Sequence, residues 1–229
     1  MSPVAVNAIV APVLKASNNN MTRSWLSGLL ISIGLIGTPI PLLAHSFDIA
    51  VIAPFSGPGI TTGESLWQGM RVATREADGH AHETSDGHLG GVDSNLLRID
   101  SNREAKQIEQ ALGEVDAGQA VIIIVLGPEQ TMPIKSLPLA RPAIIVLTGP
   151  QPSIVDNTMF SPRALTEDQL RNFNNAYHQQ YDLNANATAR RGYAAARLIA
   201  AAIRAVDGDL ANPDRVSGSF TKALADSAN

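Results

Sequence analysis

The chain of 229 residues contains no cysteine. This absence excludes disulfide bonds, zinc sites built from thiolates, catalysis by a thiol and lipid modification of an N-terminal cysteine. Aromatic residues are scarce, at 4%, whereas hydrophobic residues make up 45% of the chain, which is typical of a globular rather than a disordered protein. Internal repeats and low-complexity tracts are also missing. Ordinary hydrophobic packing must therefore hold the fold together, which is feasible at this length.

Positive charge is also in short supply. The formal net charge is −4, and Lys15 and Arg23 are the charged residues of the first 44. Removal of that segment would take away two positive charges and leave the rest of the chain at −6. A mildly acidic domain has no electrostatic reason to bind nucleic acid or anionic lipid.

The segment before residue 45 has the order of a secretory signal. A basic start at Met21–Arg23 precedes an apolar run over residues 26–36, and the segment ends with a small residue, Ala44. We expect residues 1–44 to be a signal peptide with a spurious N-terminal extension, cleaved after Ala44. Residues 45–229 would then form one domain in the periplasm. The alternative is an uncleaved anchor, although the apolar run is short for a membrane span.

Short apolar runs alternate with amphipathic segments along the rest of the chain. The two longest runs are rich in β-branched residues, and Gly-Pro stops each of them, as expected of strands buried on both faces. Apolar residues at helical spacing predict helices elsewhere. The expected strands cover residues 49–53, 95–100, 120–126 and 143–148, and the expected helices cover residues 63–77, 103–117, 165–181, 187–206 and 215–226.

This alternation predicts an α/β fold with three layers, αβα, in which right-handed crossovers join a mostly parallel sheet. Residues 78–91, rich in Gly, His and acidic residues, are expected to form a solvated loop. Residues 131–140 are expected to form a short helix or a turn broken by prolines. No strand is expected after residue 150, where the pattern becomes helical throughout.

Five stretches follow one another in an order that resembles a known family. They are IAVIAPFSGPG (49–59), LGGVDSNLLRID (89–100), AVIIIVLGPEQTMPI (120–134), ARPAIIVLTGPQPSI (140–154) and FNNAYHQQYDLNANATARRGYAAARLIAAAI (173–203). Together they resemble the type I periplasmic solute-binding proteins, specifically the branched-chain amino-acid and amide group that serves ABC importers. The resemblance covers most of residues 47–208. It implies the family's α/β lobe and capture of a small polar solute.

The chain departs from that family in two places. In the family a second lobe lies between the loop near Pro152 and the late helix pair, whereas a short segment joins them here. The family's Tyr-Asp-Ala is replaced by Tyr193-Ala194-Ala195, so a carboxylate that often binds a ligand ammonium is missing. The resemblance therefore implies a shortened, single-lobe form with C-terminal helices.

Gly-rich turns after parallel strands lie at the carboxyl edge of a sheet, where open α/β proteins bind ligands. Backbone N–H groups of three such turns, with the hydroxyls of Ser56 and Thr148, could bind a carboxylate or carbonyl. The alternative is that these residues only turn the chain. Tyr193 could cover the ligand, or it could pack against the sheet. The candidate ligand-binding residues are Ser56, Gly57, Gly127, Pro128, Glu129, Gln130, Thr148, Gly149 and Tyr193.

Two other features of the sequence contain residue types that can bind a metal ion. The 78–91 segment carries potential ligands for zinc or copper, but their spacing matches no ordered site, and a solvated loop is the expected structure. His45 could chelate copper as a mature N-terminus. No metal site or cofactor is predicted, and no nucleophile elbow or paired base indicates an enzyme. The potential metal ligands in 78–91 are His80, His82, Glu83, Asp86 and His88.

The sequence therefore predicts a non-enzymatic periplasmic protein that captures a small polar solute, of amino-acid or amide type, for an ABC importer. Its partners would be that solute and an ABC permease or another periplasmic or membrane protein. The alternative is an interaction or sensor module that keeps the binding-protein scaffold without transport.

Overall fold

The computed structural model describes residues 46–76, 85–115, 119–128, 139, 141–149 and 158–227. The chain divides into two compact units, Met1–Pro41 and Leu42–Asn229, and the described residues all belong to the second. The predicted signal peptide, His45 and nearly all of the predicted turn at 131–140 lie outside the described residues.

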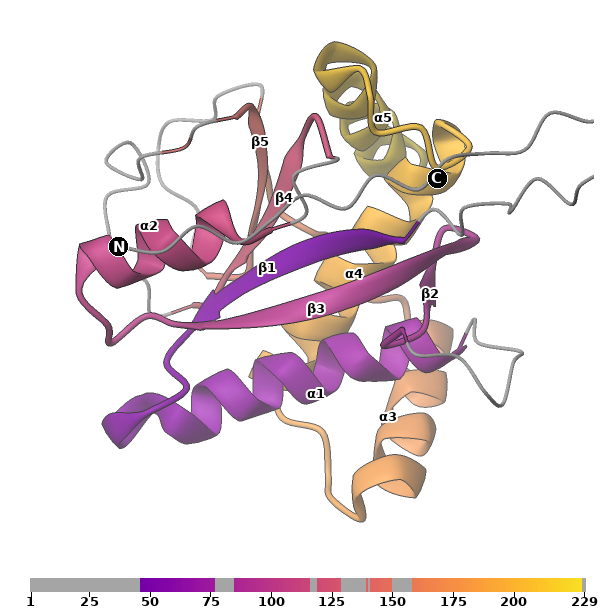
Figure 1. Cartoon of the computed structure of the whole chain (residues 1–229). Helices are drawn as coiled ribbons and strands as arrows, with labels where there is room; N and C mark the ends of the chain where they lie inside the picture. Colours follow the sequence, from indigo (N-terminus) through magenta and orange to yellow (C-terminus); the bar gives the residue numbers. More distant parts are fainter. Residues whose placement is uncertain are drawn as a thin grey trace, which may run out of the picture. The chain divides into compact units, whose positions relative to one another are not determined.

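Six strands form one sheet in the order β2-β3-β1-β4-β5-β6 (Figure 1). All neighbouring strands pair in parallel except β2, which is antiparallel to β3. The four strands expected from the sequence are confirmed as β1, β3, β4 and β5. The strands are β1 (Phe47–Ala53), β2 (His88–Leu89), β3 (Val92–Asp100), β4 (Ile122–Leu126), β5 (Ala143–Leu147) and β6 (Met159–Phe160).

Three of the described helices begin where side chains satisfy free N–H groups of the first turn. Thr166 and Gln169 form a capping box at the start of α3, and Asn186 and Asn212 cap α4 and α5. No helix among the described residues is long and apolar enough to cross a membrane. The helical elements are η1 (Gly57–Gly59), α1 (Ile60–Glu76), α2 (Ala105–Gly113), α3 (Glu167–Tyr181), α4 (Ala187–Ala205) and α5 (Pro213–Asp226).

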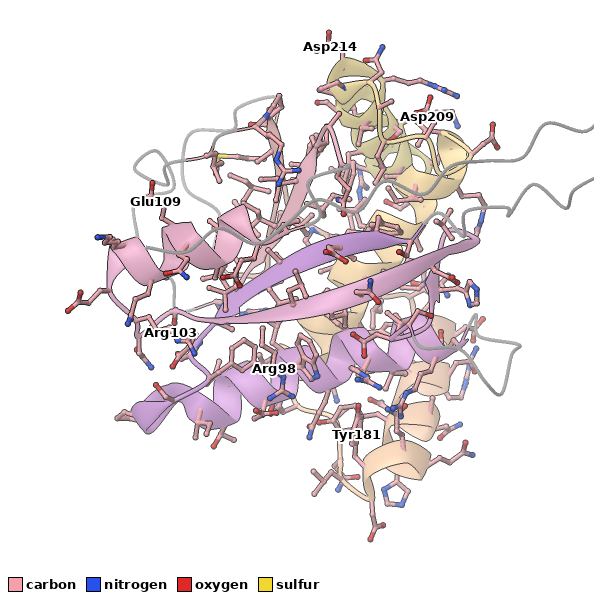
Figure 2. The ribbon with its side chains drawn as sticks, viewed as in Figure 1. Arg98, Arg103, Glu109, Tyr181, Asp209 and Asp214 are labelled. Carbon is pink, nitrogen blue, oxygen red and sulfur yellow. The ribbon has the colours of Figure 1, made fainter. Side chains whose placement is uncertain are left out.

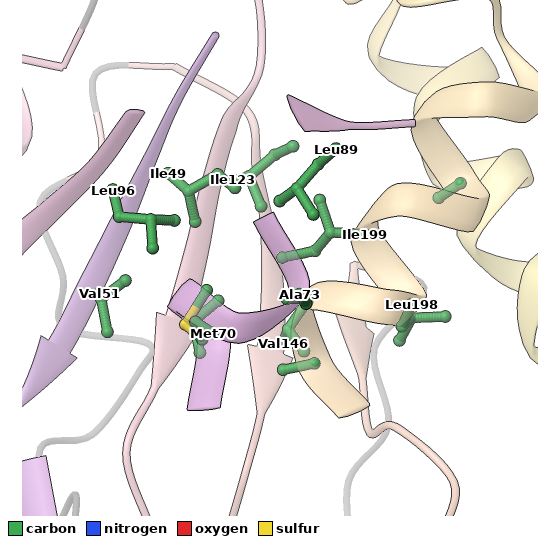
Figure 3. Close-up of a cluster of buried hydrophobic side chains, with 14 of the residues drawn as sticks. Ile49, Val51, Met70, Ala73, Leu89, Leu96, Ile123, Val146, Leu198 and Ile199 are labelled. Carbon is green, nitrogen blue, oxygen red and sulfur yellow. The ribbon is translucent and has the colours of Figure 1, made fainter. Parts of the chain in front are cut away.

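Alternate residues of the central strands enter two separate cores, as a strand buried on both faces requires. In Figure 3, Ile49 and Val51 of β1 lie with Met70 of α1 and Ile199 of α4, in the larger core. That core also receives side chains from α3 and α5, whereas Ile52 faces α2 in the smaller core. The predicted three-layer α/β fold is confirmed, with α1, α3, α4 and α5 on one face and α2 on the other.

The helices α1 and α4 pack with their backbones in close approach. A Cβ atom at Gly69 would lie 1.9 Å from the carbonyl oxygen of Ala189, and one at Gly192 would lie 2.2 Å from that of Leu66. Any side chain at either glycine would force the helices apart. This approach places the Ala-rich face of α4 directly on α1.

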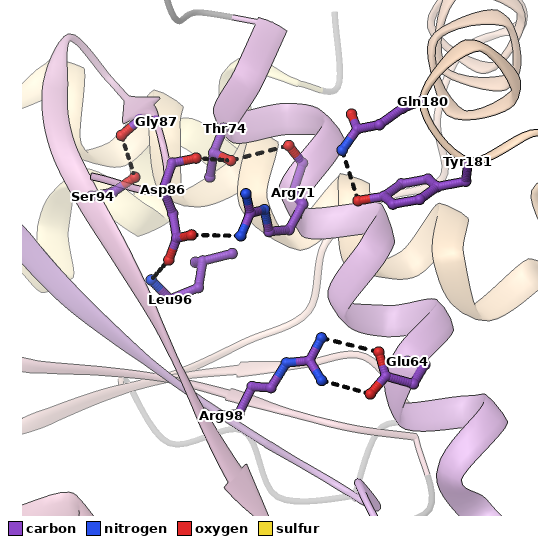
Figure 4. A network of polar contacts seen from close by, with 10 residues as sticks. All are labelled: Glu64, Arg71, Thr74, Asp86, Gly87, Ser94, Leu96, Arg98, Gln180 and Tyr181. Atoms are coloured by element: carbon purple, nitrogen blue, oxygen red, sulfur yellow. Dashed lines mark hydrogen bonds and ion pairs between the residues drawn. The ribbon is translucent and has the colours of Figure 1, made fainter. Parts of the chain in front are cut away.

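The prediction of a solvated loop over residues 78–91 is wrong for its second half. His88 and Leu89 form β2, and Leu89 is only 1% exposed. Asp86 fixes this segment: it pairs with Arg71 of α1 at 2.6 Å and accepts the N–H of Leu96 in β3 at 2.9 Å (Figure 4). The sequence pattern missed β2 because two residues are too few to show a period.

The expectation of no strand after residue 150 is also wrong. Met159 and Phe160 form β6, which pairs in parallel with Ile145 and Val146 of β5. The Phe160 ring lies 5.1 Å from the ring of Phe220 in α5, measured between centroids. The sheet therefore gains an edge strand that is held by the C-terminal helix.

Candidate functional site

The carboxyl ends of four parallel strands lie side by side. Ala53 is paired with Asp100, Ile52 with Leu126, and Leu126 with Leu147. The loops that follow these strands therefore meet at one edge of the sheet. The chain moves from β1 outward to β3 and then returns past β1 to β4, so that the strand order reverses between β1 and β4. Such a reversal is where open α/β sheets form a ligand crevice.

The loop after β1 carries the first two predicted residues. Ser56 and Gly57 are both exposed. Gly57 has a φ of 65°, a left-handed conformation that glycine adopts without steric cost. The loop then enters η1 and α1, where the Gly63 position is so close to Pro54 that a Cβ atom would lie 2.2 Å from the carbonyl oxygen of Pro54. The loop is thus held tightly between strand and helix.

Asp100, the last residue of β3, anchors this loop. Its Oδ1 accepts the backbone N–H of Phe55 at 3.0 Å and that of Asn102 at 3.2 Å. Burial acts to raise the pKa of the Asp100 carboxyl. Hydrogen bonds from the Ser56 side chain and from the two backbone N–H groups, together with the charge of Arg103, outweigh burial and hold this pKa below its ordinary value of 3.8.

Asn102 holds the same loop from the other side. Its Nδ2 donates to the carbonyl oxygen of Ser56 at 2.7 Å and lies 3.5 Å from Ser56 Oγ. Figure 2 shows Arg103 beside the end of β3, where α2 begins. Asp100 and Asn102 were not among the predicted ligand residues. The signal available in the sequence was a strand that ends in an acidic residue, which alone does not say what the acid holds.

The loops after β4 and β5 are packed against one another. Gly127 donates its N–H to the carbonyl oxygen of Ile52 at 2.8 Å. A Cβ atom at Gly149 would lie 2.8 Å from the carbonyl oxygen of Pro128. Both Pro128 and Gly149 are half-buried. The structure therefore brings the predicted residues of these two loops together.

Thr148 is turned inward. Its side chain is 3% exposed, and its hydroxyl donates to the carbonyl oxygen of Leu126 at 2.7 Å. Its backbone N–H donates to the same oxygen at 3.1 Å. These two donors close the end of β5 onto β4. They are used within the fold, as is the N–H of Gly127.

Tyr193 lies away from the three loops. It is 2% exposed, and its ring is 4.5 Å from the ring of Phe173, measured between centroids. Its hydroxyl donates to Glu76 Oε2 at 2.7 Å. Glu76 ends α1, and α1 runs from the Ser56 loop back to the opposite edge of the sheet (Figure 1). A helix of this length spans about 25 Å, so the Tyr193 hydroxyl and Ser56 lie at opposite ends of α1.

Among the remaining predicted positions, those that the structure describes add no group at this edge. Glu129 and Gln130 lie outside the described residues, as do His80, His82 and Glu83. Within the described part of the chain, no cluster of three or more His, Asp or Glu side chains could hold a metal ion. His88 instead pairs with Asp93 across the β2–β3 hairpin at 2.7 Å.

Comparison with known proteins gives fold similarity without sequence similarity. No protein-family model matches the chain, and no curated protein matches it in sequence. An ABC transporter substrate-binding protein from Sphaerobacter thermophilus is 12% identical, with a TM-score of 0.50, and the match covers 76% of this chain and 85% of that one. An ABC transporter solute-binding protein from R. palustris, solved with benzoate, is 9% identical, with a TM-score of 0.49 and the same coverage. At such identities the likeness shows a shared fold alone.

Proposed function

We propose that the protein is a non-enzymatic, periplasmic solute-binding protein that captures a small polar solute of amino-acid or amide type for an ABC importer. The observation that carries this proposal is the reversal of strand order between β1 and β4. It gathers the predicted loops at Ser56–Gly57, Gly127–Pro128 and Thr148–Gly149 at one edge. The shared fold with an ABC transporter substrate-binding protein supports the same function.

In this proposal the solute lies across the ends of β1, β4 and β5. The loop of Ser56 and Gly57 provides an exposed polar wall, and the packed pair of Pro128 and Gly149 provides the floor. The described residues form one sheet with its helices, so an ABC permease, another protein or a second copy would close the site from above. Export through residues 1–44 would deliver the domain to the periplasm.

A specific observation also favours the alternative, an interaction or sensor module. Three donors predicted to bind a ligand are used inside the fold: the N–H groups of Gly127 and Thr148 and the hydroxyl of Thr148. A sheet edge whose hydrogen-bond donors already have partners within the fold can keep its shape without a solute. Such an edge would serve as a rigid surface for a protein partner.

Ligand-dependent stability separates the two functions. The full chain should show a higher unfolding midpoint with at least one member of a panel of amino acids and their amides. A ligand at a hundredfold excess over its dissociation constant should stabilise the protein by about 2.7 kcal/mol. If no compound in the panel shifts the midpoint at millimolar concentration, solute capture is overturned and the interaction module is favoured.

A matched pair of glycine variants localises the binding. Gly149→Ala introduces a Cβ atom 2.8 Å from the Pro128 carbonyl oxygen and should weaken binding by separating the two loops. Gly113→Ala, at the end of α2, meets nothing within 4 Å and should bind as the wild type does. Equal affinities in the two variants would place the solute elsewhere.

A further inference from the structure

The outer edge of β3 is paired only along its first residues. β3 is the last long strand on its side of the sheet, and the short strand β2 runs beside its beginning (Figure 1). We propose that the remaining edge pairs with the same edge of a second copy of the chain, in antiparallel orientation about a two-fold axis at Arg98. The two sheets would then form one continuous sheet. This proposal does not depend on solute capture, and either can hold without the other.

The first step is to establish which backbone groups of β3 point outward. Successive residues of a strand direct their N–H and C=O groups to opposite sides of the strand. Leu96 donates its N–H outward, to Asp86 Oδ2 at 2.9 Å, whereas Ser101 donates its N–H inward, to the end of β1. Arg98 and Asp100 lie two and four residues after Leu96. They therefore also direct their backbone groups outward.

The second step is that the open groups of this edge complement themselves. The outward groups at its two ends are already used: the N–H of Leu96 binds Asp86, and the C=O of Asp100 accepts the N–H of Arg103 at 3.2 Å. Among the described residues, the C=O of Leu96, both backbone groups of Arg98 and the N–H of Asp100 have no partner. In an antiparallel pair centred on Arg98, the two copies of Arg98 exchange two hydrogen bonds. Each Asp100 N–H then meets the C=O of Leu96 in the other copy, so all the open groups are satisfied.

The third step concerns the charge of Arg98. A charged side chain on an edge strand ordinarily keeps a second strand away. Here the two terminal nitrogens of Arg98 bind both carboxylate oxygens of Glu64, at 2.6 and 3.0 Å (Figure 4). The guanidinium also lies 4.4 Å from the ring centroid of Trp67 and 5.2 Å from that of Phe55. The side chain is thus neutralised and held against its own α1, so two copies of Arg98 can face each other across the axis.

The other face of the edge provides apolar contact. Leu97 is half-buried and packs against the smaller core. With the axis at Arg98, Leu97 lies opposite Ile99 of the second copy, at a non-hydrogen-bonded position where side chains are closest. The pairing therefore covers the exposed part of Leu97 on both copies. Matching hydrogen bonds, balanced charges and an apolar cross-strand pair together favour a second copy as the occupant of this edge.

Sedimentation equilibrium of the full chain tests the pairing. The mass should rise from 24.2 kDa toward twice that value as the protein concentration increases. The series should extend to about 1 mM, because an interface of one strand pair is small and weak. Leu97→Lys places a charge opposite Ile99 of the second copy and should raise the dissociation constant about tenfold or more. Thr221→Ala, at an exposed position of α5, is the control and should dimerise as the wild type does. A monomer at every concentration would overturn the proposal, as would unchanged dimerisation of Leu97→Lys.

A disulfide test locates the axis and does not require Leu97→Lys to fold. The chain has no cysteine of its own, so Arg98→Cys introduces a single thiol. The Cα atoms of a hydrogen-bonded antiparallel pair lie about 5.5 Å apart, which is within the range of a disulfide. Mild oxidation should therefore convert Arg98→Cys into a covalent dimer, whereas the matched variant Thr221→Cys should remain monomeric. Equal crosslinking of the two variants would overturn the proposal and leave solute capture standing.

Discussion

The Tyr193 hydroxyl donates a hydrogen bond of 2.7 Å to Glu76 Oε2 and so joins α4 to the last residue of α1. Arg197, one turn further along α4, lies 3.8 Å from the same carboxylate oxygen. The aromatic ring of Tyr193 is buried against Phe173. The tyrosine therefore contributes both core packing and a polar contact between two helices that are distant in the sequence.

We predict that Tyr193→Phe lowers the free energy of unfolding by about 1–3 kcal/mol, because it removes a hydrogen bond to a charged group and keeps the ring. Tyr193→Ala should cost about 3–5 kcal/mol, since it also removes the buried ring. Urea unfolding at neutral pH measures both values. Equal losses in the two variants would show that the ring contributes nothing to the packing between α3 and α4.

The same tyrosine should make the protein sensitive to alkali. Burial, with the hydrogen bond to Glu76 and the negative charge of Glu76, raises the pKa of Tyr193 from 10.0 to about 12. The folded state favours the neutral phenol, so this contribution to stability is complete below pH 10. It is lost as the pH rises from 10 to about 12, where the unfolded chain ionises first. Stability measured across this range should fall more steeply in the wild type than in Tyr193→Phe.

Asp100 should make the stability of the protein sensitive to acid. Its pKa is held below 3.8 in the folded protein, so its contribution to stability is present above the pKa of the unfolded chain. That contribution is lost as the pH falls from 3.8 through the lower folded value. Asp100→Asn should be less stable than the wild type at neutral pH, and the difference should shrink in acid. A difference that is constant with pH would mean that the charge of Asp100 is immaterial.

Replacing either of two glycines with alanine should change the free energy of unfolding, in opposite directions. One glycine lies where α1 and α4 approach closely, and the other lies at an open position. Gly192→Ala places a Cβ atom 2.2 Å from the Leu66 carbonyl oxygen and should destabilise the protein by about 1–3 kcal/mol. Gly218→Ala, at an exposed position of α5, meets nothing within 4 Å and should stabilise it by about 0.5–1 kcal/mol. Urea midpoints compare the two. A stabilised Gly192→Ala variant would contradict the packing of these helices.

The central strands could be predicted from the sequence because their signal is local. The run at Ile122–Leu126 is unbroken and apolar, as is the run at Ala143–Leu147, and both become strands buried on two faces. The two-residue strands β2 and β6 carry no such signal. Each exists because a longer strand offers an unpaired edge, and that is a property of the assembled sheet rather than of either segment.

The candidate site, too, could be predicted from the sequence only in part. The placement of the loops at Ser56, Gly127 and Thr148 follows from the rule that parallel strands end at one edge, and the structure brings them together. The direction of each hydrogen bond does not follow from that rule. Whether Thr148 donates inward or outward depends on the carbonyl oxygen of Leu126, a partner 22 residues away. The position of Tyr193 likewise depends on how closely α4 approaches α1.

The position of α4 on the sheet has a consequence for synthesis of the protein. This helix covers the sheet together with α1, yet β1, β3, β4 and β5 all precede it along the chain. A ribosome therefore releases the apolar strands before the helix that shields them. Until α4 emerges, the apolar surface of these strands stays exposed to water and to other nascent chains. A chaperone would therefore bind the chain mainly at this stage of synthesis.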